Sequence, residues 1–162
     1  MRYSPWTAAL TAALLASSSA YAQTRVGDDE FRQTFRSTTM LLETGVTTCE
    51  AFEIFLAVER AQKNRGLMFV QSMRAEQGML FVYPPESRMS MWMKNTVISL
   101  DIVFLDSSGQ IINIAERTEP YSLASVRAAG PGSFVLEVNA GRAAELDLKT
   151  GTTLFRPDLA PL

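Results

Sequence analysis

Several polar side chains interrupt apolar, strand-like stretches of the sequence, and their types could support chemistry. A charge beside a strand core is costly unless it is paired or faces a cleft. In a cleft, a desolvated Lys94 would have a lowered pKa and could act as a base or nucleophile, oriented by Asp101 or Glu137. In the structural alternative, which we favour, Lys94 pairs with a carboxylate and pins the strand register. The full set is Arg65, Glu76, Lys94, Asn95, Asp101, Glu137 and Asn139.

A methionine-rich segment around this lysine supports two interpretations. With the period of two of a strand, Met89, Met91 and Met93 share one face, while Trp92 and Lys94 lie on the other. Three thioethers on one edge could hold a soft metal ion such as Cu(I). Methionines also fill apolar cores well because they are flexible and polarisable, and we favour this explanation. We therefore expect no metal site and no cofactor.

Aromatic side chains near these polar groups point to a binding site. Trp92, Tyr83 and Tyr121 could form flat apolar walls of the kind that small-molecule sites use, although a tryptophan more often serves as core. Arg88 could contact an anion. The candidate ligand-binding residues are Arg65, Trp92, Met93, Lys94, Asn95, Asp101 and Glu137.

We expect a binding module for a small molecule or another envelope component rather than an enzyme. The alternative is a hydrolase or lyase that uses Lys94 with Asp101 or Glu137. The sequence contains no histidine, which excludes Ser-His-Asp triads, histidine-ligated zinc and histidine acid–base relays. It also lacks the dinucleotide, P-loop, Cys-x-x-Cys and nucleophile-elbow motifs.

The composition is that of a globular protein. Of the 162 residues, 47% are hydrophobic and 20% are charged, with 17 acidic and 15 basic side chains. These proportions exclude disordered and collagen-like chains. The single cysteine excludes a disulfide framework. An acidic balance without a basic stripe argues against binding to nucleic acid.

The first 22 residues have the pattern of a secretory signal peptide. Arg2 supplies the positive start, residues 6–15 are mostly apolar, and Ala20-Tyr21-Ala22 is the small-x-small pattern that signal peptidases cleave. The apolar stretch is shorter than the roughly 20 residues that span a membrane, and no later segment is long and apolar enough to do so. We therefore expect cleavage near Ala22 and a periplasmic or secreted protein.

The remaining chain is expected to form a polar tether at residues 23–37, one β-rich domain at 38–157 and a tail at 158–162. The clearest local pattern is a hairpin of residues 101–105 and 110–115, whose loop needs a positive φ at Gly109. Pro84-Pro85 should end a strand, and residues 116–132 should form a loop. Further strands are expected at 38–43, 50–58, 78–83, 88–94, 133–139 and 152–155, and helices at 59–65 and 141–148.

These elements predict a mostly β fold, namely a single-domain antiparallel barrel or sandwich with two short helices. Three groups of segments occur in a characteristic order: Arg65–Met68 with Glu76–Phe81, Trp92–Thr96 with Leu100–Phe104, and Val135–Gly141. In these segments the chain resembles the uncharacterised family catalogued as domain of unknown function 192. The resemblance implies a compact, β-rich and often exported domain, and it implies no particular activity.

Overall fold

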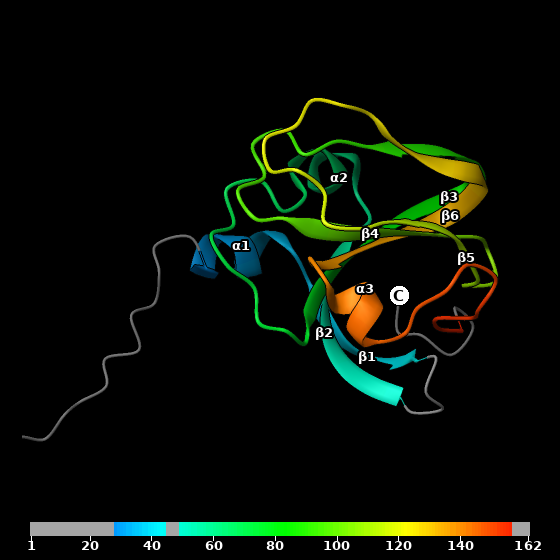
Figure 1. Ribbon diagram of the computed structural model, residues 1–162. Helices are drawn as coiled ribbons and strands as arrows, with labels where there is room; N and C mark the ends of the chain where they lie inside the picture. Colours follow the sequence, from blue (N-terminus) through cyan, green and yellow to red (C-terminus); the bar gives the residue numbers. More distant parts are fainter. Residues whose placement is uncertain (1–27, 45–48, 157–162) are drawn as a thin grey trace, which may run out of the picture.

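The structure is a computed structural model that describes residues 28–44 and 49–156 (Figure 1). Within them, six strands are hydrogen-bonded in the order β1-β2-β3-β6-β4-β5. The mostly β fold class is confirmed, with an open, sandwich-like sheet rather than a closed barrel. The elements are α1 (Asp28–Thr34), β1 (Ser37–Glu43), β2 (Cys49–Ala57), α2 (Arg60–Arg65), β3 (Gln77–Met91), β4 (Leu100–Leu105), β5 (Ile111–Ala115), β6 (Val126–Asn139) and α3 (Arg142–Glu145).

One pair of strands is parallel, and its connection brings a helix over the sheet. β2 and β3 run in the same direction, whereas the other neighbouring strands of the described sheet are antiparallel. Parallel strands need a crossover connection, which here leaves β2, passes through α2 and returns at β3. The expectation of a purely antiparallel sheet is wrong at this pair, because side-chain alternation does not reveal strand direction.

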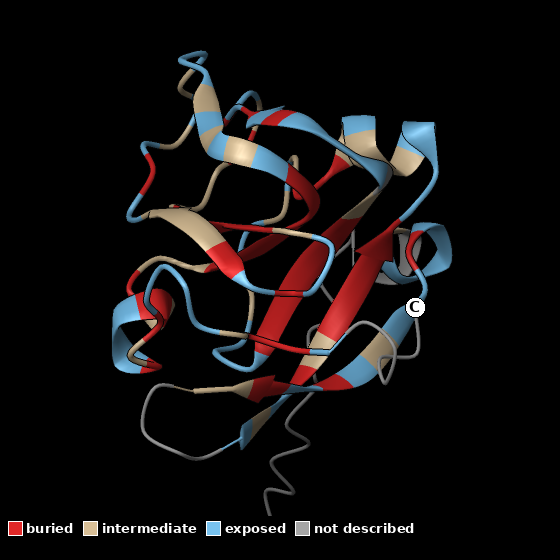
Figure 2. Ribbon diagram, turned by 90° about the vertical axis from the view of Figure 1, so that its right-hand side faces the viewer, coloured by how far each residue is buried: buried red, intermediate tan, exposed pale blue. Residues whose placement is uncertain are grey.

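The sheet is buried on both faces, and each face has its own apolar cluster. Every residue of β4 is buried, as the sequence predicts from its unbroken apolar run, and the central strands are correspondingly red in Figure 2. One cluster, which includes Phe52, Val103 and Leu136, also contains Ala143, the buried residue of α3. The other, which we call the methionine core, consists of Phe35, Phe55, Ala57, Leu67, Met79, Phe81, Met89, Met91, Met93, Leu100, Ile102, Phe104 and Val135.

β3 and β6 are longer than predicted and form an arm beyond the central sheet. The prolines at 84–85 do not end β3, because they lie within a register shift between Val82 and Ser87 where the ladder with β6 is interrupted. β6 begins at Val126 rather than at Ser133, since its first half pairs with the second half of β3. In Figure 1 this arm lies above β4, so the expected loop at residues 116–132 is wrong over its second half.

The predicted tether contains ordered structure. Residues 28–34 form α1, and Phe35 is fully buried in the methionine core, beside Phe31 at a ring-centroid distance of 4.6 Å. Phe31 and Phe35 are four residues apart and lie on one side of this turn of chain, which gives a mostly polar segment an apolar anchor. At the other end, the expected strand at 152–155 is reduced to an isolated bridge between Gln110 and Thr153.

Other local predictions are confirmed. β1 and β2 form the first antiparallel pair, although residues 45–48 of the connection lie outside the described residues. β4 and β5 form the predicted hairpin, with Gly109 at φ 80°. The predicted helix at 141–148 is shorter than expected, because α3 ends at Glu145. No helix within residues 28–44 and 49–156 has the length and hydrophobicity to span a bilayer.

Candidate functional site

The loop that follows α2 begins at a position where glycine is required. Gly66 has φ 45° and donates its N–H to the carbonyl of Gln62, which ends the helix as the sequence predicts. A Cβ at this residue would approach the Phe81 ring to 3.3 Å. The turn sends Leu67 into the methionine core and leaves the side chain of Arg65 beside the sheet face.

A second loop after β3 supplies the tryptophan, the lysine and the asparagine of the predicted site. The expected alternation is confirmed: Met91 and Met93 are buried, whereas Trp92 is 50% exposed and Lys94 is exposed. The Lys94 amine lies 5.1 Å from the centre of the Trp92 ring. Asn95 has φ 56° and turns the chain, so that the Asn95 carbonyl accepts a hydrogen bond from the N–H of Phe69 at 2.9 Å.

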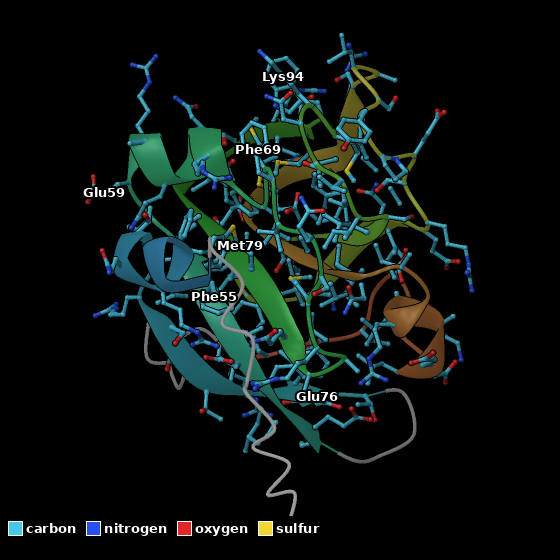
Figure 3. All side chains as sticks on the ribbon, turned by 90° about the vertical axis from the view of Figure 1, so that its left-hand side faces the viewer. Phe55, Glu59, Phe69, Glu76, Met79 and Lys94 are labelled. Atoms are coloured by element: carbon cyan, nitrogen blue, oxygen red, sulfur yellow. The ribbon has the colours of Figure 1, made fainter. Side chains whose placement is uncertain are left out.

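These two loops, α2 and the arm enclose a pocket of about 580 Å³. It lies on the methionine-core side of the sheet. Lys94, which lines the pocket, is labelled in the upper part of Figure 3 near Phe69, whereas Glu76 is labelled in the lower part. Its rim carries the four cationic side chains of Arg60, Lys63, Arg65 and Lys94. The other lining residues are Asn64, Gly66, Leu67, Met68, Phe81, Tyr83, Ser90, Met91, Trp92, Asn95, Thr96 and Glu137.

Glu137 is the only acidic residue among those that line this pocket. It is 4% exposed, and its neighbours on the adjacent strands are the apolar residues Met79 on β3 and Ile102 on β4. No ion pair of its carboxyl group is found among the described residues, and no hydrogen bond contributes to its shifted pKa. Burial without a compensating partner raises the pKa of Glu137 to about 8, so the carboxyl group is mainly protonated at neutral pH.

The phenol group of Tyr83, which also lines the pocket, has a shifted pKa for a similar reason. Burial is the main cause that raises the pKa of Tyr83 to about 12, and the charge of Glu137 adds to it. The Tyr83 hydroxyl points to the Met91 sulfur at 3.9 Å, and the Lys63 amine lies 4.6 Å from the ring centre. Tyr83 is therefore a neutral aromatic wall of the pocket.

The guanidinium group of Arg65 is also unpaired. Its Nη1 atom is buried and has no hydrogen-bond partner in the described part of the chain. The group lies over the Phe69 ring, with the guanidinium carbon 5.2 Å from the ring centre. A buried donor without a partner costs about 1–3 kcal/mol, more when it is charged, which makes Arg65 an unusual feature of a folded chain.

The structure brings together five of the predicted ligand-binding residues. Arg65, Trp92, Lys94, Asn95 and Glu137 all line the pocket, although they come from three separate parts of the sequence. Two predicted residues lie elsewhere. Met93 is 1% exposed within the methionine core and does not line the pocket. The second of these residues, Asp101, does not line the pocket either.

Asp101 is fully buried on the opposite face of the sheet and serves the backbone. Its carboxylate accepts hydrogen bonds from the N–H groups of Arg117 at 2.8 Å, Gly141 at 2.8 Å and Ala143 at 2.9 Å. It therefore holds the start of α3 and the loop after β5. Because these bonds occupy both oxygens and the side chain lies outside the pocket, Asp101 does not orient Lys94.

Other predicted contributors lie at or outside the rim. Tyr121 is 60% exposed and Arg88 is exposed, and neither lines the pocket. Of the three methionines considered for Cu(I), Met91 lines the pocket, whereas Met89 and Met93 are buried in the core. Within residues 28–44 and 49–156, no group of three or more His, Cys, Asp or Glu side chains could hold a metal ion.

The contribution of α2 was missed in the sequence, although a pattern for it exists. Arg60, Lys63 and Asn64 have the i, i+3, i+4 spacing that places three side chains on one face of a helix, and all three line the pocket. The sequence predicts this helix at 59–65 but does not by itself assign the face to a site. Nothing local indicates that this face turns towards Trp92, because the crossover decides that placement.

Comparisons with known proteins agree with this architecture. The model of the DUF192 family, described as "Uncharacterized ACR", matches residues 41–155. A crystal structure of a protein of unknown function from Novosphingobium aromaticivorans is 37% identical, with a TM-score of 0.69, and the match covers 73% of this chain and 84% of that one. A "putative transcription regulator" from Sinorhizobium meliloti is 34% identical, with a TM-score of 0.73, and the match covers 77% and 97%. No curated protein matches the sequence.

Proposed function

The chain belongs to the DUF192 family, and we propose that it is a binding module of the cell envelope whose small-molecule ligand occupies the pocket beside Trp92. The observation that carries the proposal is the unpaired, buried carboxyl group of Glu137 in the wall of a hollow of about 580 Å³. Small-molecule sites have this size, and they combine apolar walls with a few polar groups. A titratable group that desolvation perturbs and that lines a cleft is a candidate functional residue.

Binding is favoured over catalysis by the arrangement around Lys94. Its amine is exposed and lies over the Trp92 ring, and the carboxylate of Asp101 is committed to three backbone N–H groups. A nucleophilic lysine needs desolvation or a positioned partner, and neither is found here among the described residues. Of the two acids considered for a hydrolase or lyase, only Glu137 could therefore act together with Lys94.

The place of action follows from the signal-peptide pattern of the first 22 residues, which lie outside the described residues. Expression of the full chain in a Gram-negative host should release a periplasmic protein whose sequence begins at Gln23. A cytoplasmic protein that still begins at Met1 would contradict export and leave the binding proposal to be judged by the next experiment.

Ligand-observed NMR with a fragment library of acids, amines and neutral compounds tests the binding site. We expect several fragments to compete for one site in the exported protein. The variant Asn64→Trp should abolish this binding, because a large ring at this exposed lining residue of α2 would fill the pocket. Its matched control is Ala61→Trp, on an exposed residue of the same helix that does not line the pocket.

Both variants should unfold at the temperature of the wild type within a few degrees, since neither side chain is buried. If no fragment binds the wild type, or if fragments bind Asn64→Trp as well as Ala61→Trp, the pocket is not the functional site.

A further inference from the structure

We infer that the ligand of this pocket is an organic anion, with an oxygen-rich charged group that binds Arg65 and an apolar or aromatic body that lies against Trp92. This inference rests on the proposed function, because it assumes that the pocket is a ligand site. It adds the chemical class of the ligand and the residue that selects it.

The first observation is the positive charge of the side chains that line the pocket. Arg32, Arg74, Arg142, Lys149 and Arg156 form ion pairs with carboxylates of the chain, and all of them lie outside the pocket. The four cations that line the pocket form none within the described residues, and neither do Arg36, Arg88, Arg117 and Arg127 outside it. What distinguishes the rim is that four cations line one pocket with a single acidic residue. Clefts lined by one sign of charge concentrate ligands of the opposite sign. The rim therefore favours an anion and repels a cation.

Arg65 is the second observation. Its side chain makes no hydrogen bond in the described structure, and its Nη1 atom is buried beneath the pocket wall. Contact with the Phe69 ring holds the guanidinium group beside the pocket. Because Arg65 lines the pocket and no hydrogen bond of the chain uses its guanidinium group, its N–H donors are free to bind a ligand. The planar fork of these donors matches the paired oxygens of a carboxylate or phosphate.

Glu137 is the third observation. It forms no ion pair with Arg65 or Lys94, although all three line the same pocket. Since burial raises the pKa of Glu137 to about 8, its carboxyl group carries a proton at neutral pH and can donate a hydrogen bond. Arg65 and Glu137 then both offer donors, so the group that satisfies them must supply acceptors. The carbonyl oxygen of the protonated acid could also accept a hydrogen bond from an ammonium group, so it is the four cations of the rim that disfavour a cationic ligand.

The walls account for the rest of the ligand. Phe81, Tyr83, Met91 and Trp92 line the pocket with apolar or aromatic surface, and Trp92 is 50% exposed. Exposed aromatic faces of this kind stack on flat apolar groups. The ligand therefore needs an apolar body as well as a charge, which distinguishes it from inorganic phosphate or sulfate.

Three matched probes test the class of ligand: indole-3-acetate, indole-3-acetamide and tryptamine, which share one ring system and carry a negative, neutral and positive group. We expect NMR titrations at pH 7 and low salt to show at least about tenfold tighter binding of the acetate than of the amide, and the weakest binding for tryptamine. Added salt should weaken the binding of the acetate alone, because salt screens the rim charges.

The variant Arg65→Gln should remove most of the preference for the acetate over the amide and leave the binding of the amide unchanged. The matched control is Arg88→Gln, which removes an exposed cation of β3 that does not line the pocket and should preserve the preference. Equal binding of the acetate and the amide, or a preference that is undiminished in Arg65→Gln, would overturn the inference. The fragment screen with Asn64→Trp decides separately whether the pocket binds ligands at all.

Discussion

Asp101 and Glu137 are buried carboxyl groups on adjacent strands, yet their surroundings differ completely. Asp101 pairs with Val138 in the ladder between β4 and β6, and Glu137 pairs with Ile102, so the two acids are one register position apart on opposite faces of the sheet. Asp101 accepts three backbone hydrogen bonds, whereas Glu137 accepts none within the described residues. A satisfied buried carboxylate supports the fold, and an unsatisfied one beside a hollow is available to a ligand.

Removal of the Asp101 carboxylate should have the largest effect on stability. Asp101→Ala leaves the N–H groups of Arg117, Gly141 and Ala143 buried without an acceptor, and we expect a loss of about 4 kcal/mol in the free energy of unfolding. Urea denaturation measures it, and Asp101→Asn, which keeps the shape and one acceptor, should lose less. A loss below about 1 kcal/mol would show that the three bonds contribute little.

Glu137 should instead destabilise the fold when it ionises. Its folded-state pKa of about 8 lies above the ordinary 4.5, so the folded protein holds the proton more tightly than the unfolded chain. The contribution of Glu137 to stability is therefore most favourable below pH 4.5 and becomes less favourable as the pH rises to about 8. Because each pKa unit corresponds to about 1.4 kcal/mol, the loss should reach a few kcal/mol.

The variant Glu137→Gln cannot titrate, so it should not lose this stability between pH 4.5 and 8. The difference in unfolding free energy between variant and wild type should therefore change by this amount over that range, in favour of the variant. Chemical denaturation at several pH values gives the difference. Parallel pH profiles of the two proteins would show that Glu137 is not desolvated, and the contrast with Asp101 would then disappear.

Glu53 on β2 offers the opposite case and a smaller effect. Hydrogen bonding to Arg32 is the largest cause that holds the pKa of Glu53 at about 2, with further hydrogen bonding to Gln77 and the charge of Arg74. The stability from this group is present above pH 4.5 and is lost as the pH falls towards 2. Because Glu53 is partly exposed, Glu53→Gln should cost only about 1 kcal/mol at pH 7 and nothing at pH 2.

The smallest change in stability is expected at Lys94. Its side chain is exposed and forms no ion pair in the described structure, so Lys94→Met should alter the unfolding free energy by less than about 0.5 kcal/mol. Binding of indole-3-acetate should nevertheless weaken severalfold, because one rim charge is lost. Gross unfolding of the variant would instead support a structural role for Lys94.

The amino-acid sequence predicted much of the site because alternation is a local property of extended chain, although β3 ends at Met91 and residues 92–94 lie in the loop that follows rather than in the expected strand. The alternation over residues 89–94 correctly separates buried Met91 and Met93 from exposed Trp92 and Lys94. The apolar runs also identify β4 as buried on both faces. Local patterns failed where a distant partner decides the outcome: β3 continues through the prolines because β6 follows it, and β6 extends for the same reason.

By themselves, the residues determined that Asp101 and Glu137 would be ionisable groups within apolar strands, and that Gly109 would turn the loop of the hairpin. Their opposite roles depend on contacts that are distant in the sequence. The folding of α3 and Arg117 over one face provides three donors to Asp101, and the crossover through α2 leaves Glu137 facing a hollow on the other. Local sequence specifies which side chains share a strand face, whereas only the packed chain specifies what that face meets.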